Sequence, residues 1–184
     1  MGARLIKTQG GSGYTGKVQT YDVLSSHSSL LAPGDFVSET GTGTSAGRAG
    51  VDASAAAGLI TGVITSINPN FSNLEQKGLP ANTGGTVQVE VDPYALYEIE
   101  IATTALAATS IGLNAEIVAT AATSSGGAAR SNMTLDGSAT GTATAQLRIV
   151  GLVEDPDGVL ALGAIGNKAL VRINESFIKG TVGV

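Results

Sequence analysis

The chain has 184 residues and a formal net charge of −5, and only 14% of its residues are charged, against about 25% in a typical soluble domain. This length fits one ordinary domain, and the low charge content argues against a solvated disordered chain. The absence of cysteine excludes disulfides, thiol nucleophiles and cysteine-based zinc sites, and the acidic balance gives no overall attraction to nucleic acid or to anionic membranes.

Segments rich in valine, isoleucine and threonine recur between clusters of Gly, Ser, Asn and Pro, a pattern typical of short strands joined by turns. The expected strands, in chain order, are Lys17–Val23, Asp35–Ser38, Leu59–Ile67, Thr86–Val91, Leu96–Ile101, Asn114–Val118, Gln146–Val153 and Ala169–Asn174. The sequence therefore predicts an all-β fold, a β-sandwich or a barrel-like single domain, with at most one short helix. That helix, or a loop in its place, is expected around Ala102–Leu113.

The clearest alternation of apolar and polar residues surrounds a proline. Val87, Val89 and Val91 alternate with polar residues, and the same period of two returns after Pro93 in Tyr97, Ile99 and Ile101. Because proline cannot continue a strand ladder, we expect the two strands to form a hairpin. The outer face of this hairpin is expected to be acidic, since the alternating positions include Glu90, Asp92, Glu98 and Glu100.

Two segments, Glu39–Gly50 and Thr120–Thr144, consist almost entirely of Gly, Ser, Thr and Ala. Such residues bury little apolar area, so we expect long surface loops there. Loops of this length are uncommon in compact domains unless they bind a neighbour or move.

Two motifs suggest chemistry only at first sight. Gly11–Val18 matches G-x-G-x-x-G and nearly matches the phosphate-loop pattern, but Val18 replaces the magnesium-binding hydroxyl and the following residues look like a strand instead of a helix. His27 is flanked by serines, yet no G-x-S-x-G elbow is present, so we interpret it as a solvated loop residue. We expect neither a nucleotide site nor a catalytic triad.

Two further features have structural and functional interpretations. The stretch Asp155–Gly158 is a strong β-turn signal, with a cation site as the alternative, although the other ligands of a calcium loop are missing. The tyrosines Tyr14, Tyr21, Tyr94 and Tyr97 are expected to pack half-buried, with a carbohydrate platform as the alternative. We expect no cofactor and no metal.

Taken in order, several segments resemble the small capsid decoration proteins of tailed bacteriophages, also called cement or head-stabilising proteins. The likeness covers roughly Gly13 to Asn174. The segments that carry it are Gly13–Val18, Pro33–Val37, Gly62–Ile64, Val91–Pro93, Tyr97–Ile99, Ile111–Ala119, Leu135–Ser138, Gln146–Asp157 and Leu170–Asn174.

The resemblance implies a structural protein without catalysis, made in the host cytoplasm and carried on the outer surface of the virion. Its partner would be the major capsid protein, and it would stabilise the expanded shell by binding only the assembled state. By analogy with other decoration proteins, a homo-oligomer is expected, with a trimer favoured. No contact with nucleic acid or with a membrane is expected.

The chain divides into an N-terminal arm at residues 1–12, a β-rich decoration domain at 13–176 and a C-terminal tail at 177–184. Within the arm, Arg4, Leu5, Ile6 and Lys7 are charged or apolar against the bland sequence that follows them. We expect these four residues to contact the capsid, for example by adding a strand across a subunit boundary.

Other functions remain open at this point. One is a particle-displayed β-sandwich adhesin or carbohydrate-binding module that reads sugars with Tyr94, Tyr97 or the long loops. A second is the major shell protein itself, which the short strands and the lack of a long helix disfavour. An enzyme is disfavoured because no converging His, Cys or paired catalytic carboxylates are visible.

Overall fold

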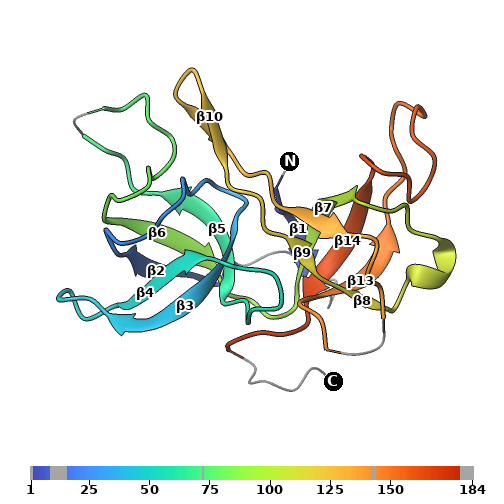
Figure 1. The fold of residues 1–184 in the computed structure, drawn as a ribbon, viewed down its shortest axis with the longest axis horizontal. Coiled ribbons are helices and arrows are strands. Elements are labelled where there is room, and N and C mark those ends of the chain that lie inside the picture. The colour runs from blue at the N-terminus through green and yellow to red at the C-terminus, as the bar shows by residue number, and fades with distance from the viewer. Residues whose placement is uncertain (1, 9–15, 72, 142–143, 179–184) are drawn as a thin grey trace.

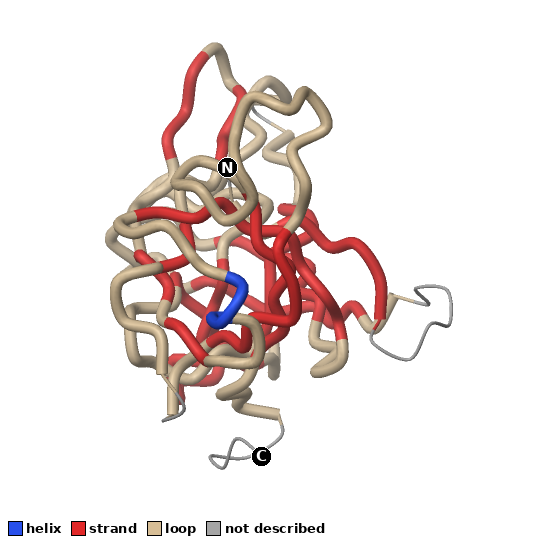
Figure 2. Tube along the Cα trace, turned by 90° about the vertical axis from the view of Figure 1, so that its right-hand side faces the viewer, coloured by secondary structure: helices blue, strands red, loops and turns tan. Residues whose placement is uncertain are grey.

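The computed structural model describes residues 2–8, 16–71, 73–141 and 144–178, and this part of the chain folds almost entirely into strands and turns. It forms fourteen strands, and its single helical element is the 3-10 turn η1 (Ala108–Ser110). Figure 2 shows this short turn beside the strands and loops. The predicted all-β, barrel-containing fold is confirmed.

The first half of the chain closes into a five-stranded barrel, at the left of Figure 1, in the order β2-β4-β3-β5-β6. Most of its pairs are antiparallel, and β6 closes the ring against β2. Its interior is filled by aliphatic side chains and one tyrosine. The barrel strands are β2 (Val18–Val23), β3 (Phe36–Gly43), β4 (Ala49–Ala53), β5 (Gly62–Ile67) and β6 (Gly85–Glu90).

A seven-stranded sheet occupies the other side of the molecule (Figure 1). Its main order is β8-β13-β14-β7-β12-β9, and β1 pairs antiparallel with the first half of β7. A separate hairpin of two strands, β10 (Thr123–Ser125) and β11 (Ala128–Arg130), projects between barrel and sheet. The sheet strands are β1 (Arg4–Thr8), β7 (Ala95–Ala102), β8 (Asn114–Ala115), β9 (Ile117–Val118), β12 (Thr134–Asp136), β13 (Leu147–Leu152) and β14 (Lys168–Ile173).

Barrel and sheet share a hydrophobic core. Phe36, Ile60 and Val63 come from the barrel half of the chain but belong to the larger cluster, which is otherwise built by the sheet. The rings of Phe36 and Tyr97 meet edge to face, with 6.0 Å between their centroids. Because aromatic contacts of this kind add to the free energy of burial, this pair helps to join the two halves into one unit.

The predicted hairpin between Thr86–Val91 and Leu96–Ile101 is wrong. Both strands exist, but β6 lies in the barrel and β7 lies in the sheet. The edges of β6 are already paired with β2 and β5, so none is left for β7. The turn at residues 92–95, closed by a hydrogen bond from the Ala95 amide to the Asp92 carbonyl, instead carries the chain from one half to the other.

The expected acidic outer face is also wrong in part, because Glu90 and Asp92 are buried at this crossing. The amide of Asp92 donates a hydrogen bond to Oε1 of Glu90 at 2.9 Å. Burial raises the pKa of Glu90. Of the four acids, only Glu98 and Glu100 remain partly exposed, on β7.

The two expected surface loops contain strands. In the first, β3 continues to Gly43 and β4 begins at Ala49, so most of the segment is a hairpin. The second contains the β10–β11 hairpin and β12, where Leu135 is fully buried between β7 and β9. Backbone ladders do not require β-branched side chains, so the bland composition concealed these strands.

Candidate binding surfaces

The expected capsid-contacting residues lie in β1, at one side of β7. Arg4 is opposite Glu98 and Leu5 is opposite Tyr97 in the antiparallel register. Leu5 packs against the larger core, and Ala3 just before the strand belongs to it. Residues 4–8 are therefore part of the sheet, and of the four expected contact residues Arg4 and Lys7 have exposed side chains.

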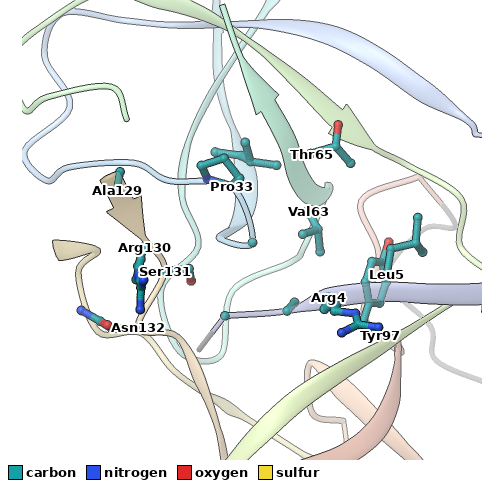
Figure 3. Close-up of a pocket in the computed structure, with 14 residues that line it drawn as sticks. Arg4, Leu5, Pro33, Val63, Thr65, Tyr97, Ala129, Arg130, Ser131 and Asn132 are labelled. Atoms are coloured by element: carbon teal, nitrogen blue, oxygen red, sulfur yellow. The ribbon is translucent and has the colours of Figure 1, made fainter. Parts of the chain in front are cut away.

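A groove of about 730 Å³ lies beside β1 (Figure 3). One wall is the segment from Gly2 to Leu5, and the opposite wall comes from Val63 to Thr65 of β5. Residues 33–34 and 129–132 complete the lining, together with Tyr97. The groove thus lies between the sheet and the barrel, with the foot of the β10–β11 hairpin at one end.

The charges of this groove have one sign. Arg4 and Arg130 line it, and no carboxylate is among the lining residues. Neither guanidinium has an ion pair or a side-chain hydrogen bond with any described residue. In a chain with 15 acidic and 10 basic residues, this is a local surface suited to a carboxylate.

A buried carboxylate lies next to the groove. Asp35 is almost fully buried and accepts a hydrogen bond from the Ala32 amide at 2.7 Å. Burial raises the pKa of Asp35 to about 6, although the nearby Ser131 hydroxyl and the hydrogen bond from the Ala32 amide act in the opposite direction. Asp35 therefore changes its charge near neutral pH, in the loop that also supplies Pro33 and Gly34 to the groove.

The loop between β5 and β6 carries two highly exposed apolar side chains. The side chain of Phe71 is 89% exposed and that of Leu74 is 70% exposed. The middle of this loop is hydrogen-bonded to the β10–β11 hairpin, because the Lys77 amide donates a hydrogen bond to the Gly127 carbonyl at 3.0 Å. The loop and the hairpin project on the same side of the molecule (Figure 1). We call Phe71 and Leu74 the apolar tip.

The loop between β13 and β14 is ordered by one carboxylate. Oδ2 of Asp155 accepts hydrogen bonds from the amides of Val159 at 3.0 Å and Leu160 at 2.9 Å, and these bonds hold the pKa of Asp155 below its usual value. The turn expected at Asp155–Gly158 is present, with the Gly158 amide bonded to the Asp155 carbonyl. Val159 is nevertheless 80% exposed at this loop.

The other two sequence motifs lie at the start of β2 and in the loop that follows it. Residues 11–15 of the glycine-rich motif lie outside them, and Val18 begins a strand as predicted. His27 is not solvated but only 2% exposed, because Nδ1 lies 2.9 Å from the Leu24 carbonyl and the loop of Asn82 bonds to its backbone. No group of three metal-ligating side chains occurs in the part of the chain that is described.

The carbohydrate platform, which was the alternative for the tyrosines, finds no support in the described residues, and Tyr14 lies outside them. Tyr97 is fully buried, which raises its pKa, and Tyr21 is buried in the barrel. Tyr94 is 55% exposed and lies at the crossing between barrel and sheet. The neighbouring pair Tyr94 and Tyr97 therefore presents no shared face to a sugar.

No family model, curated protein or solved structure matches the chain. Among the described residues, no helix has the length and apolarity that crossing a membrane demands.

The sequence interpretation missed the most prominent surface features. Phe71 and Leu74 are isolated large apolar residues inside a polar, turn-rich stretch, and Arg130 is the only charged residue between Glu116 and Asp136. The sequence signal for these surface features was therefore a large apolar or a charged residue within a segment of small and polar residues. The position of Arg130 across from Arg4 depends on tertiary structure and has no local signal.

Proposed function

We propose that this protein is a structural component of a virus particle that binds the outside of an icosahedral phage capsid and stabilises the expanded shell. Its partner is the major capsid protein, and the function requires no catalysis. The ordered resemblance to capsid decoration proteins supports this proposal, and so does an all-β fold whose most exposed apolar residues, Phe71, Leu74 and Val159, lie on loops.

The apolar tip is the observation that carries the proposal. Two large and highly exposed apolar residues lie three positions apart on the β5–β6 loop, and exposed apolar patches mark surfaces that bind other proteins. Phe71 and Leu74 would each contribute about 1.5–3 kcal/mol if they were fully buried by a partner. Aromatic anchors of this kind dominate the energetics of many interfaces.

Stabilisation of the shell follows from selective binding. A protein that binds the expanded state and not the disassembled subunits stabilises that state by mass action, by about 2.7 kcal/mol at a free concentration of 100 times Kd. Many copies act on one shell, so a modest affinity at each site gives a large total effect.

The expected contact of β1 remains part of the proposal through Lys7, which is exposed and does not line the groove. Deleting residues 1–9 is a poor test, because it removes β1 from β7 and Ala3 from the core. The substitution Lys7→Glu tests the contact without this loss of packing.

The experiment is co-sedimentation of the purified protein with expanded capsids that lack it, measured to saturation. We expect binding at a fixed ratio to capsid protein, and capsids that survive a higher temperature. The variant Phe71→Ser/Leu74→Ser should bind about tenfold or more weakly, whereas Ile111→Ser, a similarly apolar exposed position on another loop, should bind normally. An absence of saturable binding by the wild-type protein, or glycan binding in its place, would overturn the proposal in favour of a displayed adhesin.

A further inference from the structure

We propose that copies of this chain associate with one another by a loop-in-groove contact, in which the β13–β14 loop of one copy enters the groove beside β1 of another. The residues of the loop and of the groove are complementary in charge and in apolarity. This contact between copies involves neither the apolar tip nor the capsid, so it does not depend on the proposed capsid binding.

The loop offers two carboxylates and two apolar side chains. Glu154 and Asp157 are exposed, and neither carboxylate has an ion pair or a hydrogen bond with any described residue. Val159 and Leu160 follow directly and are also exposed. Residues 154–160 contain three acids and no base, so the loop itself is negative.

The loop is already in a fixed conformation. The carboxylate of Asp155 binds the amides of Val159 and Leu160, and the Leu106 amide donates to the Gly163 carbonyl at 2.8 Å. A segment that is ordered before binding loses less conformational entropy when it docks, so more of its contact energy contributes to affinity.

The groove offers the opposite chemistry. Arg4 and Arg130 are its charged residues, and both are without a partner among the described residues. Leu5, Pro33 and Val63 supply apolar surface between them. Guanidinium groups form strong charge-assisted hydrogen bonds with carboxylates, so Glu154 and Asp157 of a second copy match Arg4 and Arg130.

The size of the groove agrees with this occupant. The groove has a volume of about 730 Å³, within the range of ~300–1,000 Å³ that is typical of pockets for small-molecule ligands. Such ligands are as large as several side chains together. It has room for the Val159 and Leu160 side chains with the two carboxylates at the rim. Since loop and groove are different surfaces, two copies can exchange loops about a two-fold axis, or several copies can close a ring.

The test is the mass of the purified full-length protein in solution, measured by light scattering after gel filtration across a range of concentrations, without capsids. We expect the wild-type protein to form dimers or larger assemblies. The variants Arg130→Glu and Asp157→Arg should each weaken association by about tenfold or more, because each places like charges in contact. The double variant Arg130→Glu/Asp157→Arg should recover association, since it restores one pair of opposite charges across the contact.

Matched controls are Lys77→Glu and Glu75→Arg, which make the same changes of charge at exposed positions outside loop and groove. They should associate like the wild-type protein. A wild-type protein that stays monomeric at all concentrations, or assemblies that neither single variant weakens, would overturn the proposal. Failure of capsid binding would leave this result unchanged, so the two proposals can fail separately.

Discussion

The side-chain amide of Gln146 donates a hydrogen bond to the carbonyl oxygen of Gly58 at 2.6 Å. The same nitrogen also reaches the Ala55 carbonyl at 2.8 Å, and Oε1 accepts from the Ile117 amide at 3.2 Å. Gln146 directly precedes β13 of the sheet, whereas Ala55 and Gly58 belong to the β4–β5 connection of the barrel. One fully buried side chain thus joins the two halves through polar contacts.

A substitution of Gln146 tests how much its hydrogen bonds between barrel and sheet contribute to stability. Gln146→Leu keeps a similar volume but leaves the Gly58 carbonyl and the Ile117 amide without this partner, whereas the Ala55 carbonyl still accepts from the Gly58 amide. Each unsatisfied buried group costs about 1–3 kcal/mol. We expect the free energy of unfolding to fall by about 3 kcal/mol, measured by chemical denaturation followed by circular dichroism. The exposed Gln19 provides the control: its Oε1 accepts one hydrogen bond, from the Tyr21 hydroxyl at 3.3 Å, so Gln19→Leu should cost at most about 1 kcal/mol. Equal losses in both variants would contradict the role of Gln146.

Asp35 gives the protein a predictable dependence on pH. Its pKa is about 6 in the folded chain and near 3.8 when unfolded, so between these values the folded state binds more protons. The contribution of Asp35 to stability is therefore highest below about pH 4, declines as the pH rises to about 6, and is constant above. The shift of about two pKa units corresponds to about 3 kcal/mol in total.

Asp35→Asn should remove this dependence, because an amide oxygen can still accept the Ala32 hydrogen bond without acquiring charge. We expect the variant to gain stability relative to the wild-type protein as the pH rises from 4 to 7. Denaturation curves of both proteins at several pH values measure this difference. A constant difference across the range would show that Asp35 does not titrate between these values.

The strands that were predictable are those whose side chains alternate. All eight expected ranges overlap observed strands, and the range Asn114–Val118 is only divided at Glu116, where β8 pairs with β13 and β9 pairs with β12. Local spacing determines which residues can form a strand, but not which edge the strand will pair with. The crossing at Pro93 illustrates this limit, because β6 and β7 follow each other in the chain and lie in different sheets.

The candidate surfaces were predictable only in part. The charged and apolar residues of Arg4–Lys7 indicated a special segment, yet their place beside β7 follows from the register of Leu5 with Tyr97. The groove joins residues from five separate parts of the chain, so no local pattern could indicate it. Likewise, His27 and Glu90 look like surface residues in the sequence, and both are buried by segments that pack on them from elsewhere.

Substitutions of Tyr97 separate the contribution of its aromatic ring to stability from the contribution of its hydroxyl. The ring is fully buried against Phe36, but the hydroxyl has no hydrogen-bond partner among the described residues. Tyr97→Phe should therefore be neutral or stabilising, whereas Tyr97→Ala should cost about 3–5 kcal/mol through the cavity it leaves. Thermal unfolding of both variants measures the contrast, and a large loss in Tyr97→Phe would reveal a polar partner of the hydroxyl.

Gly62 tests how closely barrel strands approach each other. A Cβ at this position of β5 would lie 2.1 Å from the Glu90 carbonyl oxygen, and that oxygen belongs to the backbone of β6 and cannot rotate away. Gly62→Ala should therefore force the β5–β6 pair apart and cost about 3 kcal/mol.

Gly151 of β13 is the matched control, because a Cβ there would meet no atom within 4 Å. Gly151→Ala should be neutral or stabilise by up to about 1 kcal/mol, since alanine has less freedom in the unfolded chain. Urea denaturation of the two variants compares them directly, and a Gly62→Ala protein as stable as Gly151→Ala would show that the barrel can widen at this pair without cost.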